Sequence, residues 1–373
     1  MSIREIIRAL DWTLLSAVLL LILVGFAMLI SATDRGSLLS SLFTKQLIAA
    51  GVGLTLGLVA IKTPYHVWRQ YSWVVYGAGI AGLLLVTVLG AVVRGAISRL
   101  EIFGFQIQPS EYMKVALVMV LAWLFSQVKN IRLKLILISG LVVGIPVILV
   151  AQEPDFGVAS LMVAMWVGLL IFSGLSWRII AVLGIVGILA SGGLWQWTLL
   201  DYQKERVLTF LDPSQDPLRS GYNVTQSIIA LGSGQVLGRG LGQGPQSQLK
   251  FLPERHTDFV LASIGEELGF IGIAGVVILY GVMLWRLLLI ARRTQDPFGQ
   301  LIVVAVFLLL LASFVVSAGM NMALLPVTGI PLPLISYGGS NLVVTLFLIG
   351  LVESVHVYST FMRRPTPEIS HFV

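Results

Sequence analysis

The sequence predicts an all-α polytopic membrane protein with ten transmembrane helices, both termini in the cytoplasm, and a large extracytoplasmic loop between the seventh and eighth helices. Three observations lead to this prediction. Of the 373 residues, 57% are hydrophobic and only 11% are charged, whereas soluble domains carry about 25% charged residues. Long apolar runs recur along the chain, and about 20 helical residues cross the hydrocarbon core. Lys and Arg gather in alternate connecting segments, as cytoplasmic loops of membrane proteins do.

The predicted spans follow one another along the chain and belong to a single membrane domain over residues 1–373. They cover residues 12–31, 43–61, 73–92, 109–127, 134–151, 156–173, 177–199, 257–290, 299–323 and 337–361. The first span is too long for the apolar stretch of a signal peptide, so we expect it to remain as an anchor. The eighth is longer than a bilayer requires, so one of its ends should tilt or project.

The positive charges set the predicted orientation. With the N-terminus inside, most Lys and Arg fall in cytoplasmic segments, and the short outer segments hold only Arg35, Lys45, Arg94 and Arg99. Topology therefore explains the net charge of +6 better than nucleic-acid binding does. The absence of cysteine excludes disulfides, thiolate metal sites and cysteine nucleophiles. The largest segment outside the spans is the glycine-rich outer loop of residues 200–256.

The fourth span contains two opposite charges. Glu111 and Lys114 are three residues apart, so they share one face of a helix and can pair. Pro109 and Glu111 also have the composition of a helix start. A charge inside an apolar helix is costly unless it faces protein or water. The pair is therefore either a structural ion pair or part of a polar cavity, and both interpretations remain open.

Two more acids stand at the predicted outer turn between the fifth and sixth spans. Glu153 and Asp155 flank a proline there. Asp155 has the position of an N-cap for the sixth helix. The alternative is that the two outward carboxylates bind a cation or a sugar hydroxyl.

The densest polar cluster is residues 251–259, directly before the eighth span. It places Asp258 in the predicted first turn of that helix. Ala262, Gly265 and Gly269 follow at helical spacing on the same face, and such a small-residue face indicates close packing or a groove. Asp258 is therefore either a helix cap or a carboxylate that faces a groove at the outer membrane edge.

Two segments are rich in glycine or proline. Residues 238–244 resemble a phosphate-binding loop only superficially, because no strand and helix flank them, and we expect a loop with a close backbone approach or with flexibility instead. Residues 326–333 and 336–340 carry several prolines and glycines at an outer membrane edge. This composition predicts a broken or re-entrant segment that is buried in protein or lines a cavity.

Together these motifs resemble the SEDS family (shape, elongation, division and sporulation), and most of all its RodA branch. The matching segments span nearly the whole chain in the expected order: residues 108–111 with Lys114, 153–157, 226–244, 251–259, 265–269, 325–333 and 336–340. Two positions depart from the family pattern. Leu100 follows Arg99 where an Arg-Trp pair is usual, and Ser317 stands where Asn is common.

The resemblance implies a peptidoglycan glycosyltransferase that polymerises lipid II, an undecaprenyl-diphosphate-linked disaccharide pentapeptide. It implies action outside the bacterial cytoplasmic (inner) membrane during cell elongation and shape maintenance. It also implies a class B penicillin-binding protein as transpeptidase partner, other parts of the elongation machinery, and no nucleic acid. Asp258 matches the acid required for activity. The residues expected to contact substrate are Arg99, Glu111, Lys114, Asp155, Arg255, His256 and Ser340.

A carboxylate at a helix start suits a general base that accepts the proton of an acceptor hydroxyl. The leaving pyrophosphate needs positive charge, which Arg99, Lys114, Arg255 or a divalent cation (Mg or Mn) could supply. No cofactor is otherwise expected. The alternatives are a lipid II flippase, whose acids should lie near the membrane midplane, a division-type member of the same family, and an inactive scaffold for the transpeptidase.

Overall fold

A computed structural model describes residues 3–32, 41–89, 91–93, 96–102, 105–128, 132–153, 155–197, 204, 208–210, 220–249 and 251–362. A long helix corresponds to each predicted span: α2 (Trp12–Ser31), α3 (Ser41–Lys62), α4 (Tyr65–Leu89), α5 (Pro109–Ser126), α6 (Leu133–Gln152), α7 (Phe156–Phe172), α8 (Trp177–Trp197), α12 (Val260–Arg293), α13 (Pro297–Asn321) and α14 (Gly339–Met362). Of the described helices, six are long and apolar enough to cross a membrane. The chain is thus a helical, multi-pass membrane protein.

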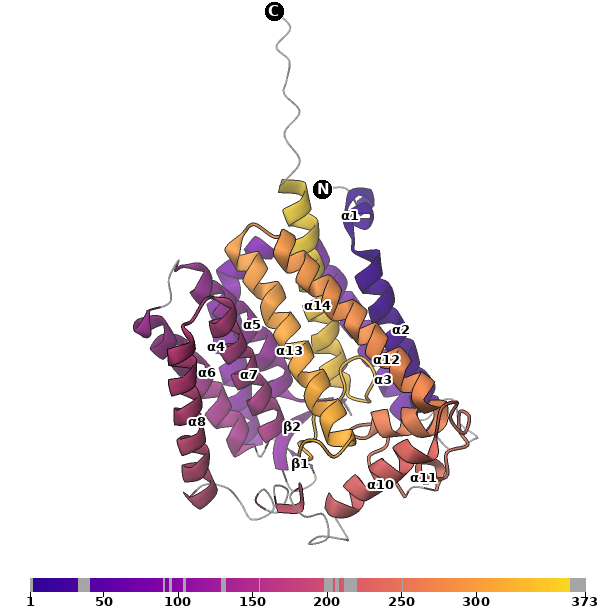
Figure 1. The fold of residues 1–373 in the computed structure, drawn as a ribbon. Helices are drawn as coiled ribbons and strands as arrows, with labels where there is room; N and C mark the ends of the chain where they lie inside the picture. Colours follow the sequence, from indigo (N-terminus) through magenta and orange to yellow (C-terminus); the bar gives the residue numbers. More distant parts are fainter. Residues whose placement is uncertain are drawn as a thin grey trace, which may run out of the picture.

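The helices form one bundle with two distinct ends (Figure 1). One end, here the α1 end, carries the short helix α1 (Ile3–Ala9) and the end of α14. The opposite end, here the sheet end, carries strands β1 and β2, α10 (Ser220–Ser233) and α11 (Pro245–Gln248). Within the bundle α3 packs along α14, α4 packs along α5, and α12 lies against α2 and α13. Both ends of the described chain therefore lie on the same side of the bundle.

A small antiparallel sheet corrects the all-α prediction. Strands β1 (Ala91–Val93), β2 (Ala96–Ile102) and β3 (Phe105–Ile107) follow one another in the order β1-β2-β3. Leu100 pairs with Ile107, and β3 leads directly into α5. The strands are too short, and their apolar alternation too brief, to stand out from the loop between two apolar helices.

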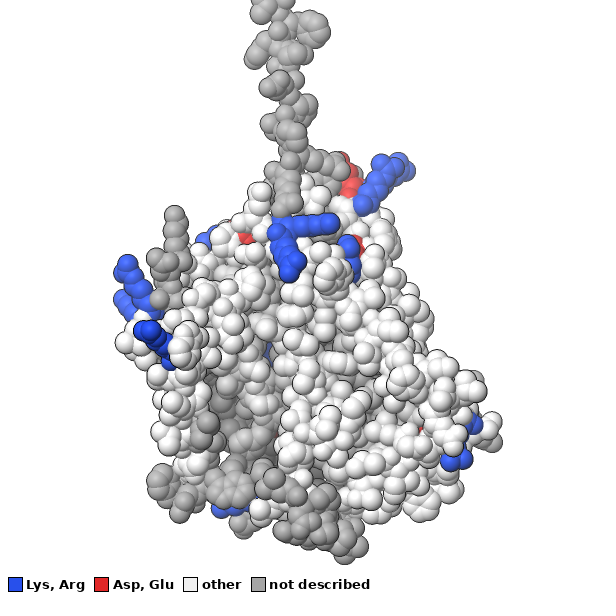
Figure 2. Space-filling model, viewed as in Figure 1, with Lys and Arg blue, Asp and Glu red and all other residues white. Residues whose placement is uncertain are grey.

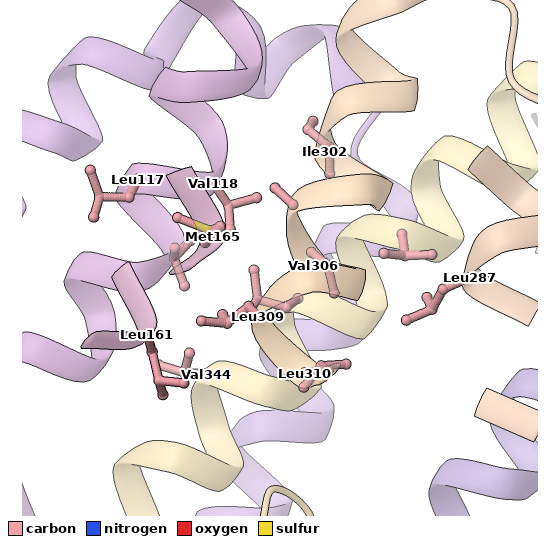
Figure 3. Packing of buried hydrophobic residues seen from close by; sticks show 14 of the residues in the cluster. Leu117, Val118, Leu161, Met165, Leu287, Ile302, Val306, Leu309, Leu310 and Val344 are labelled. Carbon is pink, nitrogen blue, oxygen red and sulfur yellow. The ribbon is translucent and has the colours of Figure 1, made fainter. Parts of the chain in front are cut away.

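The core lies where α5, α7, α13 and α14 meet. Figure 3 shows Leu117, Leu161, Met165, Leu309 and Val344 converging from these helices, and each is at most 2% exposed. At about 25 cal/mol per Å² of buried apolar area, each such side chain contributes about 2 kcal/mol. This packing holds the helices whose ends build the polar region at the sheet end.

The outer surface has the charge pattern of a membrane protein. In Figure 2, Lys and Arg gather mainly at the α1 end, and the broad middle of this face is almost without charge. Large apolar side chains such as Val74, Leu141, Trp177 and Leu189 are more than half exposed. A soluble protein rarely exposes so much contiguous apolar surface, so this belt is suited to lipid.

Part of the predicted outer loop is folded against the start of α12. A Cβ at Gly234 would lie 1.9 Å from the carbonyl oxygen of Gly265, and one at Gly238 would lie 2.2 Å from that of Glu267. The glycine-rich run of residues 234–244 therefore makes a close backbone approach, which is one of the two alternatives that the sequence offers. Opposite it, Gly269 has φ 69° and kinks α12, so the long eighth span bends instead of projecting straight.

The segment between α13 and α14 is irregular and enters the bundle. Ile330, Leu332 and Ile335 are at most 3% exposed. A Cβ at Gly25 of α2 would lie 2.5 Å from the carbonyl oxygen of Ile335, and the hydroxyl of the buried Tyr280 in α12 donates to the Pro333 carbonyl. Residues 322–338 are thus a broken segment, as the proline and glycine pattern predicts. Ile330 and residues 332–336 are buried in protein, whereas Met322, Leu324 and Gly329 are exposed.

Candidate active site

Asp258 lies in a tight turn before α12, and not in its first turn as the sequence predicted. Glu254 has φ 54°, and its carbonyl accepts hydrogen bonds from the amides of Thr257 and Phe259 at 3.1 and 3.2 Å. The N-cap residue of α12 is Phe259, and no side chain of its own turn caps the helix. Asp258 is therefore not the helix cap, and its side chain is only partly buried.

The 322–338 segment forms the other wall of this site. The amide of Tyr337 donates to the His256 carbonyl at 2.8 Å, and the Ser336 hydroxyl donates to the Thr257 carbonyl at 2.6 Å. Gly329 has φ 72°, and a Cβ there would lie 3.7 Å from Asp258 Oδ2. The glycine permits this backbone conformation and places no side chain of its own against the carboxylate.

Arg255 and His256 flank the same turn. The Arg255 guanidinium donates to the carbonyl of Ala32, the C-cap residue of α2, at 2.5 Å. The ring of His256 meets the ring of Tyr337 edge to face, with centroids 5.7 Å apart. Both residues therefore hold the turn against its neighbours, and their predicted contacts with substrate stay predictions.

A second set of predicted residues joins this region through short polar contacts. The Ser340 hydroxyl accepts from the Gln108 amide at 3.1 Å and donates to the Gln106 carbonyl at 3.3 Å. The Gln108 side-chain amide donates to Asp155 Oδ2 at 2.6 Å, and Asp155 Oδ1 accepts from the Val158 amide at 3.2 Å. Asp155 is thus the predicted N-cap of α7, and its second oxygen ties α7 to the start of α5.

The start of α7 also approaches the 322–338 segment. A Cβ at Gly157 would lie 2.8 Å from the Thr328 carbonyl oxygen, one residue from the glycine that lies beside Asp258. The structure therefore brings Asp155, Ser340, His256 and Asp258 into one region at the sheet end, although they come from three separate parts of the sequence.

Glu111 and Lys114 form the predicted pair within α5. Lys114 Nζ lies 2.7 Å from Glu111 Oε2, and their side chains are only 4% and 3% exposed. The same carboxylate oxygen accepts from Asn341 Nδ2 at 3.0 Å, and Asn341 follows Ser340 in α14. The pair therefore ties α5 to α14 directly beneath the polar region.

Glu153, at the end of α6, is a buried acid of a different kind. It is 2% exposed, and neither carboxylate oxygen has a hydrogen-bond partner among the described residues. Burial, and then the negative charge of Asp155, raise the pKa of Glu153 to about 8. The group is therefore mostly protonated at neutral pH.

Other residues of the sequence motifs lie in β2 and α12. Arg99 is in β2, where it pairs with Ala91, and its side chain lies outside the described part of the structure. Glu266 Oε1 accepts from the Gln246 amide at 2.7 Å, and Glu267 Oε2 accepts from the Ser31 hydroxyl at 2.5 Å. These two acids of the 265–269 motif fasten the glycine-rich run to α12 and α2 and are not part of the site.

Sequence reasoning missed the two asparagines of this region. Asn341 directly follows the 336–340 motif, so a polar residue at the start of an apolar helix could have revealed it. Asn321 donates to the Asp258 carbonyl at 2.8 Å, and no local pattern signals this bond, because Asp258 lies 63 residues away in the sequence. Among the described residues, no group of three or more His, Asp or Glu side chains could hold a metal ion.

Comparisons with known proteins show the family to which the chain is similar. Residues 9–361 match a family described as cell cycle protein and named for FtsW, RodA and SpoVE. The peptidoglycan glycosyltransferase MrdB of Escherichia coli (strain K12) is 37% identical over 361 residues, which are 95% of this chain and 95% of MrdB.

Two solved structures share the fold. One comes from work on the structural coordination of polymerization and crosslinking by a peptidoglycan synthase complex. It has a TM-score of 0.81 and 31% identity, and the alignment covers 93% of this chain and 97% of that one. The rod shape determining protein RodA of Thermus thermophilus has a TM-score of 0.71 and 28% identity, over 94% and 97% of the two chains.

Proposed function

Because the chain belongs to the FtsW, RodA and SpoVE family and is a peptidoglycan glycosyltransferase, we propose that it polymerises lipid II at the sheet end of the bundle, with Asp258 as catalytic base. The observation that carries this proposal is the placement of Asp258. It is a partly exposed carboxylate at the start of α12, beside Gly329 and outside the helix ladder. A base that must reach a hydroxyl needs this access.

In the proposed reaction, Asp258 accepts the proton of the 4-hydroxyl of the acceptor's N-acetylglucosamine. The hydroxyl oxygen attacks the anomeric carbon of the donor, and the bond to undecaprenyl diphosphate breaks with inversion at that carbon. The donor already carries a good leaving group, so orientation and proton transfer are what this chain must supply.

The developing charge on the diphosphate needs a positive partner. Arg255 lies three residues before Asp258 and borders the same turn, so we propose it as this partner. Lys114 is buried and paired with Glu111, so it supports the site through α14 unless substrate displaces that pair. A divalent cation (Mg or Mn) stays the alternative partner of the diphosphate, and the proposed steps use the protein's own cations.

The membrane orientation follows from the same proposal. We place α1 and the end of α14 in the cytoplasm and the sheet end outside the bacterial inner membrane, with ten spans. Lys and Arg at the α1 end support this orientation (Figure 2), and so does the position of both described chain ends on one side (Figure 1). Residues 200–256 are then the outer loop of a single domain.

Elongation and cell shape are the proposed process, because MrdB and a rod shape determining protein are among the relatives. A class B penicillin-binding protein is the proposed partner, since a related chain belongs to a complex that coordinates polymerization and crosslinking. A flippase is the second candidate. It is disfavoured because the binding site of an alternating-access transporter lies near the membrane midplane, whereas Asp258 lies at one end of the bundle (Figure 1).

The test uses purified protein and fluorescent lipid II, with and without a class B penicillin-binding protein. Polymer supports the proposed enzyme, leaflet exchange without polymer indicates a flippase, and neither activity in either condition indicates a scaffold. We expect Asp258→Asn to lower the polymerisation rate by about 10²–10⁴-fold. Glu101→Gln, at an exposed acid of β2, is the matched control and should polymerise normally. An active Asp258→Asn variant contradicts the assignment.

A further inference from the structure

Asn321, the last residue of α13, is fully buried against the start of α12. Its Nδ2 donates to the carbonyls of Asp258 and Ser317, each at 2.8 Å. Its Oδ1 accepts from the Ala262 amide at 3.0 Å. Both amide protons of the side chain are used. Exchanging Oδ1 and Nδ2 would place an oxygen against the two carbonyls and an NH₂ group against the Ala262 amide. These contacts therefore fix the orientation of the side chain.

The contact with Ala262 replaces a missing helix cap. A helix start leaves unsatisfied amides, and an N-cap side chain normally accepts from the amide two or three residues further on. Phe259 holds the N-cap position of α12 and has no such side chain. Ala262 is three residues after it, so Asn321 caps α12 from a different helix.

The contact with Asp258 acts on the residue that we assign as the base. The Asn321 side chain hydrogen-bonds the main chain on both sides of the helix start, at the carbonyl of residue 258 and at the amide of residue 262. A carboxylate on a short side chain follows its main chain closely, so fixing the main chain at 258 limits where the carboxylate lies. In catalysis, a displacement of 1 Å can cost about 10²-fold in rate.

Asn321 is itself held from the opposite direction. Its own carbonyl accepts from the Ser227 hydroxyl of α10 at 2.7 Å, in a fully buried contact. The asparagine therefore lies at the junction of α10, α12 and α13, and hydrogen bonds restrain both its side chain and its main chain.

We propose that Asn321 is a positioning residue that sets the place of the Asp258 carboxylate by bridging α13 to the start of α12. This inference rests on the proposed role of Asp258. It predicts a loss that appears in kcat for lipid II polymerisation and leaves KM for lipid II unchanged, because Asn321 is buried behind the main chain of residue 258.

The test compares kcat, KM and Tm of four variants of the full chain in detergent or nanodiscs. Asn321→Ala removes all three side-chain bonds and should lower kcat by about 10²-fold. Asn321→Asp keeps an acceptor for Ala262 but sets a carboxylate oxygen against the Asp258 carbonyl, so kcat should fall at least as far. Ser317→Ala changes a buried hydroxyl without a partner among the described residues, one turn away on the same helix, and should keep the wild-type kcat.

The fourth variant separates positioning from stability. Leu309→Ala removes a core side chain of α13 that is 2% exposed and should lower Tm by creating a cavity. Assayed well below its Tm, it should keep its kcat. If Leu309→Ala and Asn321→Ala lose kcat in proportion to their loss of Tm, Asn321 is structural only and the inference is overturned.

Two further results have distinct meanings. If Asp258→Asn is inactive and Asn321→Ala has the wild-type kcat, the proposed base survives and the positioning role is overturned. If Asp258→Asn remains active, the proposed base fails, and the inference about Asn321 fails with it. A kcat-specific loss in both Asn321 variants, with normal Ser317→Ala and Leu309→Ala, supports the inference.

Discussion

The buried pair of Glu111 and Lys114 gives the sharpest test of how the polar region is held together. At 2.7 Å and an effective dielectric constant of about 20, two unit charges attract each other by about 6 kcal/mol. Desolvation offsets much of this, and removing one partner of a buried pair typically costs about 3–5 kcal/mol. Either Glu111→Gln or Lys114→Met should therefore destabilise the protein by about that amount.

The double variant should recover most of the loss, because no charge is then left buried alone. Glu111→Gln keeps an oxygen that can accept from Asn341, as Glu111 Oε2 does at 3.0 Å, so that second bond is conserved in the cycle. Equilibrium unfolding by denaturant in detergent gives the free energy of each variant. The expected coupling between the two positions is about 3 kcal/mol or more.

Single effects that simply add in the double variant would refute this reasoning, since they would mean that the two charges do not stabilise each other. The polymerisation rate of the double variant then decides between the two roles that the sequence left open. A stable and active double variant identifies a structural pair. A stable but inactive one shows that Glu111 or Lys114 also contacts substrate.

Three further predictions concern other parts of the chain. Gly234→Ala should lower Tm by overpacking, because its Cβ would lie 1.9 Å from a carbonyl of α12, whereas Gly232→Ala has nothing within 4 Å and should be neutral or slightly stabilising. The pKa of Glu153 is raised from 4.5 to about 8 by burial. Stability should therefore fall between pH 4.5 and 8 as the unfolded chain loses the proton that the folded chain keeps, and Glu153→Gln should flatten Tm against pH over that range. Arg286 donates to Asp11 through Nε and Nη2 at 2.5–3.0 Å at the α1 end, so Arg286→Ala should cost about 1.5–3 kcal/mol. This prediction assigns a purely structural role to the Arg286–Asp11 pair. An Arg286→Ala variant with unchanged Tm, or one that is folded but polymerises more slowly, would contradict that role.

The sequence was most informative where a signal is local. Apolar runs located the long helices, the spacing of Glu111 and Lys114 predicted their pairing, and the position of Asp155 predicted its cap of α7. The pair and the cap depend on residues within one helical turn, and the apolar runs depend on consecutive residues. A family resemblance supplied the weight placed on Asp258, for which the local pattern allowed a helix cap as an equal alternative.

What the sequence did not predict depends on distant contacts. The three strands before α5 are too short to show a pattern, and α10 lies within a segment that composition identifies only as a glycine-rich loop. The buried amide of Asn321 contacts residues 59 and 63 positions away. A short stretch of sequence contains either Asn321 or these contact residues, but not both. Only the packed structure therefore reveals the two hydrogen bonds.

The order in which the chain is synthesised gives the turn at Asp258 a further property. The partners that hold it, Asn321 and Ser336, lie 63 and 79 residues further along the chain. At 5–20 residues per second, these residues follow on the order of 10 s later. A ribosome-bound chain that has released α12 therefore still lacks the groups that hold the turn with the proposed base. If Asp258 is that base, the site is assembled only after α13 and the segment that follows it have been synthesised.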